Sequence, residues 1–199
     1  MPPTAGSSTA SAPRPTFLFD LASPSSWLVA ERILQVMPVA TEWVPVHLDP
    51  ARVTREGEGF RCADEELIWR EQIERRAAEL GVQAVRWPPE VPFDSSFAMR
   101  AATYAKVTGR TVAFSLAAFR QAWCGGRSLA DVDSVLIAAA ACELHPKAVL
   151  KGADLRSTRT ALERASEGVD AVPAIVLPGG ETFTGEDAPE RAAGSIALR

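Results

Sequence analysis

Short apolar runs of the kind that form buried strands lie near both ends of the chain. They are Thr16–Leu21 (TFLFDL), Glu42–Leu48 (EWVPVHL) and Pro173–Leu177 (PAIVL). Pro45 cannot donate to a strand ladder, so the second run is predicted to be an edge strand or to contain a bulge. The pair Gly179-Gly180 is a two-residue turn signal, and it predicts that the following ETFT completes a β-hairpin with the third strand.

Helical periodicity fills the chain between these strands. After the first strand, Pro24–Met37 is apolar apart from a narrow polar edge, which predicts a mostly buried helix. Further helices, ended by Gly or Pro, are predicted over residues 64–80, 94–107, 111–124, 129–144 and 154–167. Pro146 is interpreted as one of these stops, and a short last helix is predicted to begin near Asp187. The order β-α-β, helical block, α-β-β-α predicts an α/β fold.

Composition restricts the class of protein. The 199 residues are 47% apolar and 23% charged, with a mean hydropathy of +0.00, which is typical of one globular domain. A net charge of −4 argues against nucleic acid as a partner, because phosphate binding needs a dense basic surface. Residues 1–15 are interpreted as a flexible tail and not as a secretory signal, and residues 16–199 as a single domain with a helical insertion at about 63–145. No apolar stretch is long enough to span a membrane, so we expect a cytoplasmic protein with no membrane partner.

Three cysteines, Cys62, Cys124 and Cys142, are too few and too widely spaced for a disulfide framework or a zinc site. They are predicted to be small, buried and inert. The alternative, a thiol enzyme, would require one of them to lie beside Pro173. With only two histidines and no ligand spacing, the sequence predicts no bound metal.

Three segments carry a family resemblance. They are FLFDLASPSSWLVAERI, PFDSSFAMRAA and VPAIVLPGGETFTGED, in that order. They resemble the DsbA-like thioredoxin-fold superfamily, and most of all its branch of 2-hydroxychromene-2-carboxylate isomerases and kappa-class glutathione transferases. The resemblance covers roughly residues 16–195. It implies a thioredoxin fold with a helical insertion, glutathione as the cofactor, and a homodimer of the kind that many relatives form.

Ser23 is the candidate catalytic residue. The redox members of the superfamily carry Cys-x-x-Cys where this chain has Ser23-Pro24-Ser25-Ser26. A hydroxyl cannot replace a thiolate in disulfide exchange, so dithiol chemistry is excluded at this motif. In the isomerase and transferase branch, a serine at the place of Ser23 binds the sulfur of glutathione, and a helix N-terminus favours the thiolate form. Ser-Pro is also a common helix start, and this cap role is compatible with the catalytic one.

Four further residues are implied in binding glutathione. The resemblance implies a cis peptide bond before Pro173, with Val172 pairing with glutathione like an added strand. The alternative is a proline that merely opens a strand. Asp187 matches the aspartate that holds the γ-glutamyl end, although it is equally a helix N-cap. Glu186 departs from the family pattern, because its carboxylate stands where a small neutral side chain is expected and would repel the carboxylate of the ligand.

The substrate site is left open by the sequence. Arg52, Arg55 and Arg61 would either meet an anionic group or lie on a solvated surface. Four aromatic residues would either wall a substrate pocket or belong to the core: Trp69, Trp87, Phe93 and Trp123. The leading hypothesis is a glutathione-dependent isomerase or transferase of a small aromatic or unsaturated substrate. The alternatives are a non-catalytic binding module and an atypical DsbA-family oxidoreductase.

Overall fold

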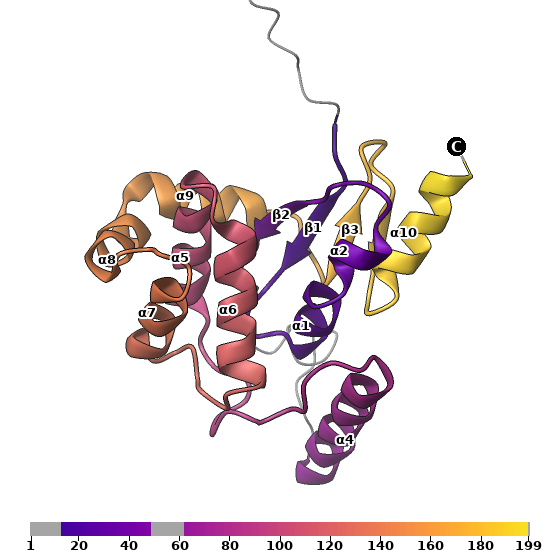
Figure 1. Cartoon of the computed structure of the whole chain (residues 1–199), viewed down its shortest axis with the longest axis horizontal. Helices are drawn as coiled ribbons and strands as arrows, with labels where there is room; N and C mark the ends of the chain where they lie inside the picture. The colour runs from indigo at the N-terminus through magenta and orange to yellow at the C-terminus, as the bar shows by residue number, and fades with distance from the viewer. Residues whose placement is uncertain (1–12, 49–61, 199) are drawn as a thin grey trace, which may run out of the picture.

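The computed structural model of the protein describes residues 13–48 and 62–198, which form one four-stranded sheet surrounded by helices (Figure 1). This arrangement confirms the predicted α/β class. Most of the predicted N-terminal tail and the segment 49–61, with Arg52, Arg55 and Arg61, lie outside the described residues.

The sheet has the strand order β2-β1-β3-β4. The central strand β1 (Thr16–Phe19) pairs in parallel with β2 (Glu42–Pro45) and antiparallel with β3 (Ala174–Val176), which pairs antiparallel with β4 (Thr182–Thr184). The edge position predicted from Pro45 is therefore confirmed. The hairpin turn was predicted to have two residues, but the Leu177 amide donates to the Glu181 carbonyl at 2.8 Å, which leaves a three-residue loop ending at Gly180. Gly180 has φ +86°, which a glycine adopts without steric cost.

The helices largely follow the predicted pattern. They are α1 (Pro24–Ala30), α2 (Ile33–Val36), α4 (Ala63–Glu79), α5 (Ser96–Val107), α6 (Thr111–Trp123), α7 (Val132–Ala140), α8 (Pro146–Asp154), α9 (Arg156–Ser166) and α10 (Ala188–Ala197).

Two of these predictions need correction. The helix predicted over Pro24–Met37 is two helices, because the chain leaves helical geometry at Arg32. Pro146 does not only end the preceding segment. It also begins helix α8, which was not predicted from the sequence. Proline suits the first turn of a helix, and His145 caps this turn by accepting a hydrogen bond from the Lys147 amide.

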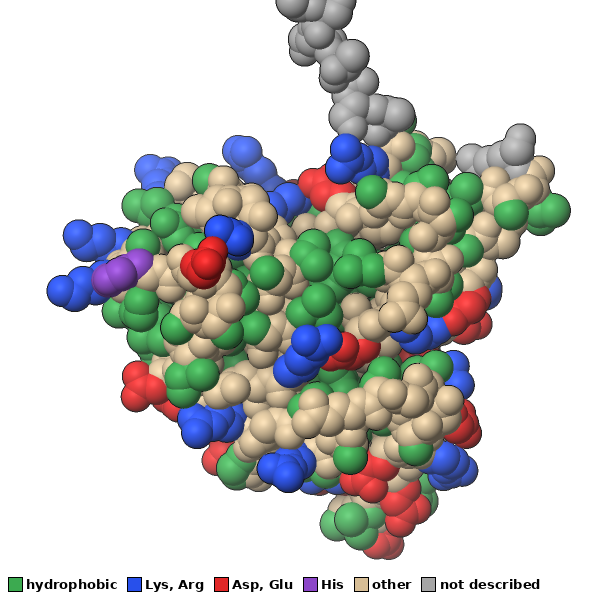
Figure 2. All heavy atoms as spheres, in the orientation of Figure 1, with side chains coloured by type: hydrophobic (Ala, Val, Ile, Leu, Met, Phe, Trp, Pro, Cys, Tyr) green, Lys and Arg blue, Asp and Glu red, His purple; other side chains and the backbone are tan. Residues whose placement is uncertain are grey.

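The helices fall into groups on two sides of the sheet. Helices α5 to α9 lie beside the β2 edge, where α5 and α9 contact β2, whereas α10 packs against α2, β3 and β4 (Figure 1). Helix α4 projects below α1 and contacts it. On the face shown in Figure 2, acidic and basic side chains are interspersed, with no continuous basic stripe.

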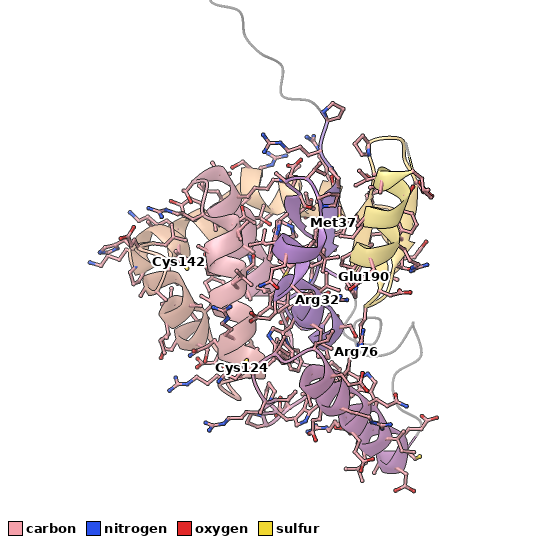
Figure 3. The ribbon with its side chains drawn as sticks, turned by 45° about the vertical axis from the view of Figure 1, so that its right-hand side comes forward. Arg32, Met37, Arg76, Cys124, Cys142 and Glu190 are labelled. Atoms are coloured by element: carbon pink, nitrogen blue, oxygen red, sulfur yellow. The ribbon has the colours of Figure 1, made fainter. Side chains whose placement is uncertain are left out.

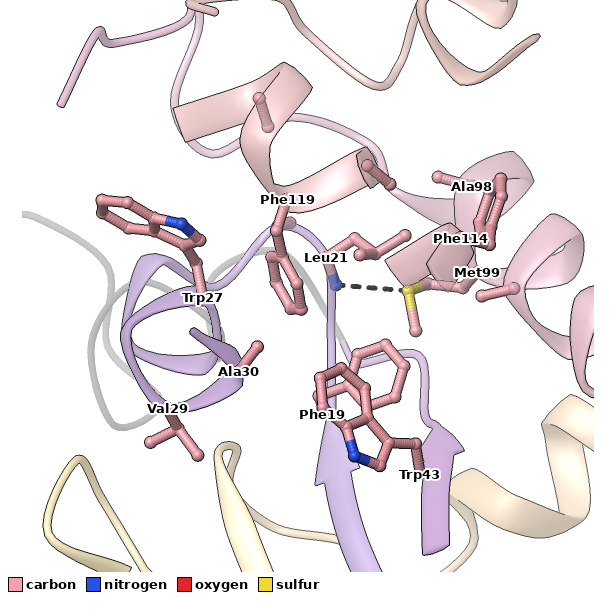
Figure 4. Close-up of a cluster of buried hydrophobic side chains, with 14 of the residues drawn as sticks. Phe19, Leu21, Trp27, Val29, Ala30, Trp43, Ala98, Met99, Phe114 and Phe119 are labelled. Carbon is pink, nitrogen blue, oxygen red and sulfur yellow. Dashed lines mark hydrogen bonds between the residues drawn. The ribbon is translucent and has the colours of Figure 1, made fainter. Parts of the chain in front are cut away.

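The connection between β1 and α1 is anchored in the core from both sides. The Leu21 amide donates to the Met99 sulfur at 3.2 Å (Figure 4), and the Trp123 indole N–H donates to the Leu21 carbonyl at 3.2 Å. Phe19 packs against Phe119 with ring centroids 5.7 Å apart, and all five side chains are fully buried. Contacts from α5 and α6 therefore fix the point at which α1 begins.

Candidate functional site

The candidate residues meet at the edge of the sheet where β1 ends and β3 begins. Leu18 pairs with Ala174, and continuing this antiparallel register places Phe19 and Asp20 opposite Pro173 and Val172. The Val172-Pro173 peptide bond is cis, as the resemblance implied. Gly185 donates its amide to the Pro173 carbonyl at 3.0 Å, which brings the start of α10 to the same edge.

Ser23 caps the first turn of α1. Its side-chain oxygen accepts a hydrogen bond from the Ser26 amide at 3.1 Å, and Pro24 follows at the first helical position. This cap uses an oxygen lone pair, so the hydroxyl proton stays available, and no acceptor for it lies among the residues that the structure describes. Ser23 is 0% exposed. The Ser26 hydroxyl is also buried and lacks a partner within the described residues.

Glu186 is held by two neighbours that the sequence analysis did not associate with it. Its carboxylate accepts a hydrogen bond from the Ser25 hydroxyl at 2.9 Å and lies 3.5 Å from Nε of Arg76 on α4. Its carbonyl accepts from the guanidinium of Arg32, which also pairs with Glu190 (Figure 3). Burial, and then the charge of Arg76, lower the pKa of Arg32, while Glu186 acts in the opposite direction. The extra carboxylate is thus matched by positive charge within the fold.

Asp187 and Val172 each bring polar groups to this edge: an exposed carboxylate paired with Arg191, and backbone groups without a partner in the described residues. Asp187 stands at the N-cap position of α10 but makes no side-chain cap hydrogen bond. Its carboxylate is 63% exposed and lies 3.1 Å from Arg191. Val172 is partly buried, and its backbone N–H and C=O form no hydrogen bond within the described residues.

A buried polar cluster lies behind this edge, around Asp20. The Asp20 carboxylate is fully buried and accepts from the Ala22 amide at 2.9 Å, the Ser95 hydroxyl at 2.7 Å and the Leu48 amide at 3.1 Å. His47 Nδ1 lies 3.5 Å from the same carboxylate. The backbone carbonyl of Asp20 accepts from the amide of Ser23 at 3.1 Å, which joins this cluster to the start of α1. This cluster was not predicted from the sequence, although a carboxylate within an apolar strand run is a usable signal.

His47 gives this cluster a pH dependence. The hydrogen bond to Asp20 raises the pKa of His47 above its ordinary 6.5, and Asp94 adds to this, while burial and Arg100 oppose it. A folded-state pKa above the unfolded value means that His47 stabilises the fold below about pH 6.5 and loses this contribution as the pH rises through the folded-state pKa. We expect the difference in unfolding free energy between the wild type and His47→Gln to be largest near about pH 6 and to shrink toward about pH 8. Denaturant unfolding across this range measures it, and a difference that grows with pH would contradict the assignment.

The cysteines divide into two kinds. Cys124 and Cys142 are buried, and they lie in the helical part of the molecule at the ends of α6 and α7 (Figure 3). Burial, reinforced by the charge of Glu31, raises the pKa of Cys124 to about 11, and burial also raises the pKa of Cys142. Both are therefore poor nucleophiles at neutral pH. The prediction of burial is wrong for Cys62, which is exposed because it stands just before the first turn of α4.

The four aromatic residues of interest form a chain of ring contacts. The Trp87 ring lies 5.2 Å from Trp69 on α4 and 5.8 Å from Trp123 on α6, and Phe93 lies 5.7 Å from Trp123. Trp123 and Phe93 are buried. Packing of the connection between α4 and α5 against α4 and α6 therefore accounts for these side chains, in line with the core interpretation.

Residues 13–48 and 62–198 contain neither a metal-binding cluster nor a helix suited to a membrane. No group of three histidine, cysteine or acidic side chains in residues 13–48 and 62–198 is arranged to hold a metal ion. None of the described helices combines the length and the apolar character needed to cross a membrane.

Comparison with known proteins identifies the family. A model of the DSBA-like thioredoxin domain matches residues 16–197, nearly the whole chain. The chain belongs to the DSBA-like thioredoxin domain family. This membership confirms the fold that the sequence resemblance implied. No curated protein matches the sequence significantly.

Solved structures share this DSBA-like fold at low sequence identity. A 2-hydroxychromene-2-carboxylate isomerase superposes with a TM-score of 0.75 at 16% identity, covering 92% of this chain and 94% of the other. A probable DsbA oxidoreductase from Streptomyces coelicolor gives 0.73 at 18% identity, with 94% and 89% covered. A cytosolic disulfide reductase, DsbM, from Pseudomonas aeruginosa, whose structure was solved with GSH, gives 0.63 at 14% identity, with 94% and 100% covered.

Proposed function

We propose that this DSBA-like protein is a cytoplasmic, glutathione-dependent isomerase or transferase that acts on a small aromatic or unsaturated substrate. The observation that carries the proposal is the hydrogen bonding of the Ser23 hydroxyl. Its oxygen caps α1, while its proton has no acceptor among the described residues. A thiolate near this serine would receive that proton as a hydrogen bond, together with the positive end of the α1 dipole.

The other candidate residues suit the remaining parts of glutathione. The free backbone N–H and C=O of Val172 would pair with the peptide portion, as in strand addition. The exposed carboxylate of Asp187 would pair with the ammonium of the γ-glutamyl end. Because Ser25 and Arg76 already hold the Glu186 carboxylate, its repulsion of the ligand carboxylate is reduced.

The proposed chemistry uses the thiolate of glutathione, because the Ser23-Pro24-Ser25-Ser26 motif itself has no thiol. The glutathione sulfur would add to an electrophilic carbon of the substrate and form a C–S bond. In an isomerase, rotation about the former double bond and loss of the thiolate would complete the reaction. In a transferase, the adduct would be protonated and released. Ser23 would hold the sulfur anion at the start of both routes.

A non-catalytic binding module is the second candidate, and the burial of Ser23 favours it. Ser23 is 0% exposed, and the bridge from Ser25 through Glu186 to Arg76 lies beside it. A ligand that reaches the hydroxyl has to displace neighbouring groups, whereas a module would use only the outer edge formed by Val172 and Asp187.

Calorimetric titration with reduced glutathione tests the proposal. We expect saturable binding by the wild type and a loss of a few-fold in affinity in Asp187→Ala, because an exposed ion pair contributes up to about 1 kcal/mol. The matched control is Asp133→Ala, which removes an exposed carboxylate from the first turn of α7 and should leave the affinity unchanged. No heat of binding up to millimolar glutathione would favour the binding module instead.

A further inference from the structure

A pocket of about 530 Å³ lies between the end of β2, the first turns of α5 and helix α9. Its lining includes His47, Arg100 and Leu162, and none of the residues discussed as glutathione ligands. This volume is within the range of roughly 300–1,000 Å³ that small-molecule sites occupy.

Arg100 brings to this pocket a guanidinium without an ion-pair partner among the described residues. Its guanidinium lies over the Phe97 ring at 5.7 Å, and its Nε is buried with no hydrogen-bond partner among the described residues. No carboxylate of the described residues forms an ion pair with it. The other arginine of the pocket, Arg159, already pairs with Asp154 at 3.1 Å. Because a buried guanidinium nitrogen costs free energy when it is unpaired, Arg100 is suited to an anionic ligand.

His47 supplies a second donor. Ser95 gives its proton to Asp20, so its oxygen, 3.3 Å from Nδ1 of His47, shares the Nδ1 hydrogen with the Asp20 carboxylate 3.5 Å away. This arrangement leaves Nε2 without a partner in the described part of the chain. The two serine hydroxyls of the lining are already used, since Ser96 donates to Asp94 and Ser166 donates to the Leu162 carbonyl.

We propose that this pocket binds a small organic monocarboxylate, with its carboxylate on Arg100 and the Nε2 hydrogen of His47 and its apolar part against Leu162. The charges around the pocket favour a ligand with a single negative charge. Arg100 and a protonated His47 attract an anion, whereas Glu163 of the lining and Asp20 and Asp94 beside His47 oppose a second negative charge. A phosphate dianion would therefore be repelled more strongly than a monocarboxylate.

The proton on His47 makes the site sensitive to pH. The charged groups that face this imidazole are Asp20 after β1, Asp94 and Arg100 on the α5 side, and Arg159 and Glu163 on α9. The acidic neighbours favour the imidazolium and the arginines oppose it. The affinity for a carboxylate should therefore fall as the pH rises from about 6 to about 8, since the imidazole keeps its Nδ1 hydrogen and loses both its Nε2 hydrogen and its positive charge.

Titration of the full chain with benzoate, benzamide, acetate and inorganic phosphate tests this proposal. We expect saturable benzoate binding that is at least about tenfold tighter than that of benzamide, which loses the charge-assisted pair with arginine. Phosphate should also bind at least about tenfold more weakly, because its second negative charge is repelled by Glu163 and it has no apolar part to contact Leu162. Arg100→Gln should weaken benzoate binding about tenfold, while Arg100→Lys, which keeps the charge, should weaken it less. The control is Arg127→Gln, an exposed arginine outside the pocket lining, which should have no effect.

Two further measurements distinguish this pocket from the proposed glutathione site at Ser23. Saturating glutathione should leave the benzoate affinity unchanged, and His47→Gln should remove its pH dependence. The proposal is overturned if neither carboxylate binds at millimolar concentration, if Arg100→Gln binds benzoate as well as the wild type does, or if phosphate binds more tightly. Because the benzoate and glutathione titrations are independent, failure of one does not imply failure of the other.

Discussion

Replacing Asp20 with alanine is expected to lower the free energy of unfolding by about 3 kcal/mol or more. The carboxylate accepts hydrogen bonds from the amides of Ala22 and Leu48 and from the Ser95 hydroxyl, and all of these lie in buried surroundings. Alanine cannot accept any of them. Each buried donor left without a partner costs roughly 1–3 kcal/mol, so the losses accumulate at this single position.

Chemical denaturation of Asp20→Ala and the wild type measures this effect, provided that the slope of the unfolding transition is unchanged. The control is again Asp133→Ala, which removes an exposed carboxylate and should cost less than about 1 kcal/mol. Equal stabilities of Asp20→Ala and the control would show that the Asp20 cluster does not hold the start of α1 as described.

Removing the Ser23 hydroxyl is expected to separate its two roles. Ser23→Gly should reduce glutathione addition to an enone such as methyl vinyl ketone by about 10²–10³-fold, the usual cost of losing one donor to a reacting anion. The cap should suffer far less, because glycine at an N-cap costs only a few tenths of a kcal/mol relative to serine. Single-turnover rates and unfolding midpoints of the same preparations measure both effects.

Two serine variants complete this comparison. Ser23→Thr retains a hydroxyl that can cap α1 and donate to sulfur, so it should keep most of the activity. Ser115→Ala alters another fully buried serine, on α6, and should leave the rate unchanged. If Ser23→Gly reacts as fast as the wild type, the serine is only a helix cap and the catalytic proposal fails.

The sequence predicted the features of the fold that depend on local patterns. The three apolar runs located β1, β2 and β3, and the Gly179-Gly180 turn signal located β4. Pro45 indicated an edge strand, and Ser23-Pro24 predicted the start of α1. The family resemblance added the cis bond before Pro173. These features follow from periodicity, from turn and cap chemistry, or from a family pattern, so one chain was sufficient to find them.

The contacts between distant segments could not be predicted in the same way. Glu186 appeared to be an uncompensated carboxylate because nothing near it in the sequence indicates Arg76, which reaches it from α4. The link from Asp20 to Ser95 and His47 likewise joins three elements. Helix α8 was missed because Pro146 was interpreted only as a stop, although proline also suits a first helical position.

The pKa of the glutathione thiol, measured by the ultraviolet absorbance of the thiolate with the protein in excess, tests the central claim most directly. A thiolate stabilised by Ser23 and the N-terminus of α1 should ionise well below the roughly 8.5 of a free thiol, and Ser23→Gly should return the pKa toward that value. A bound thiol that ionises like free glutathione in the wild type would contradict a catalytic role for Ser23.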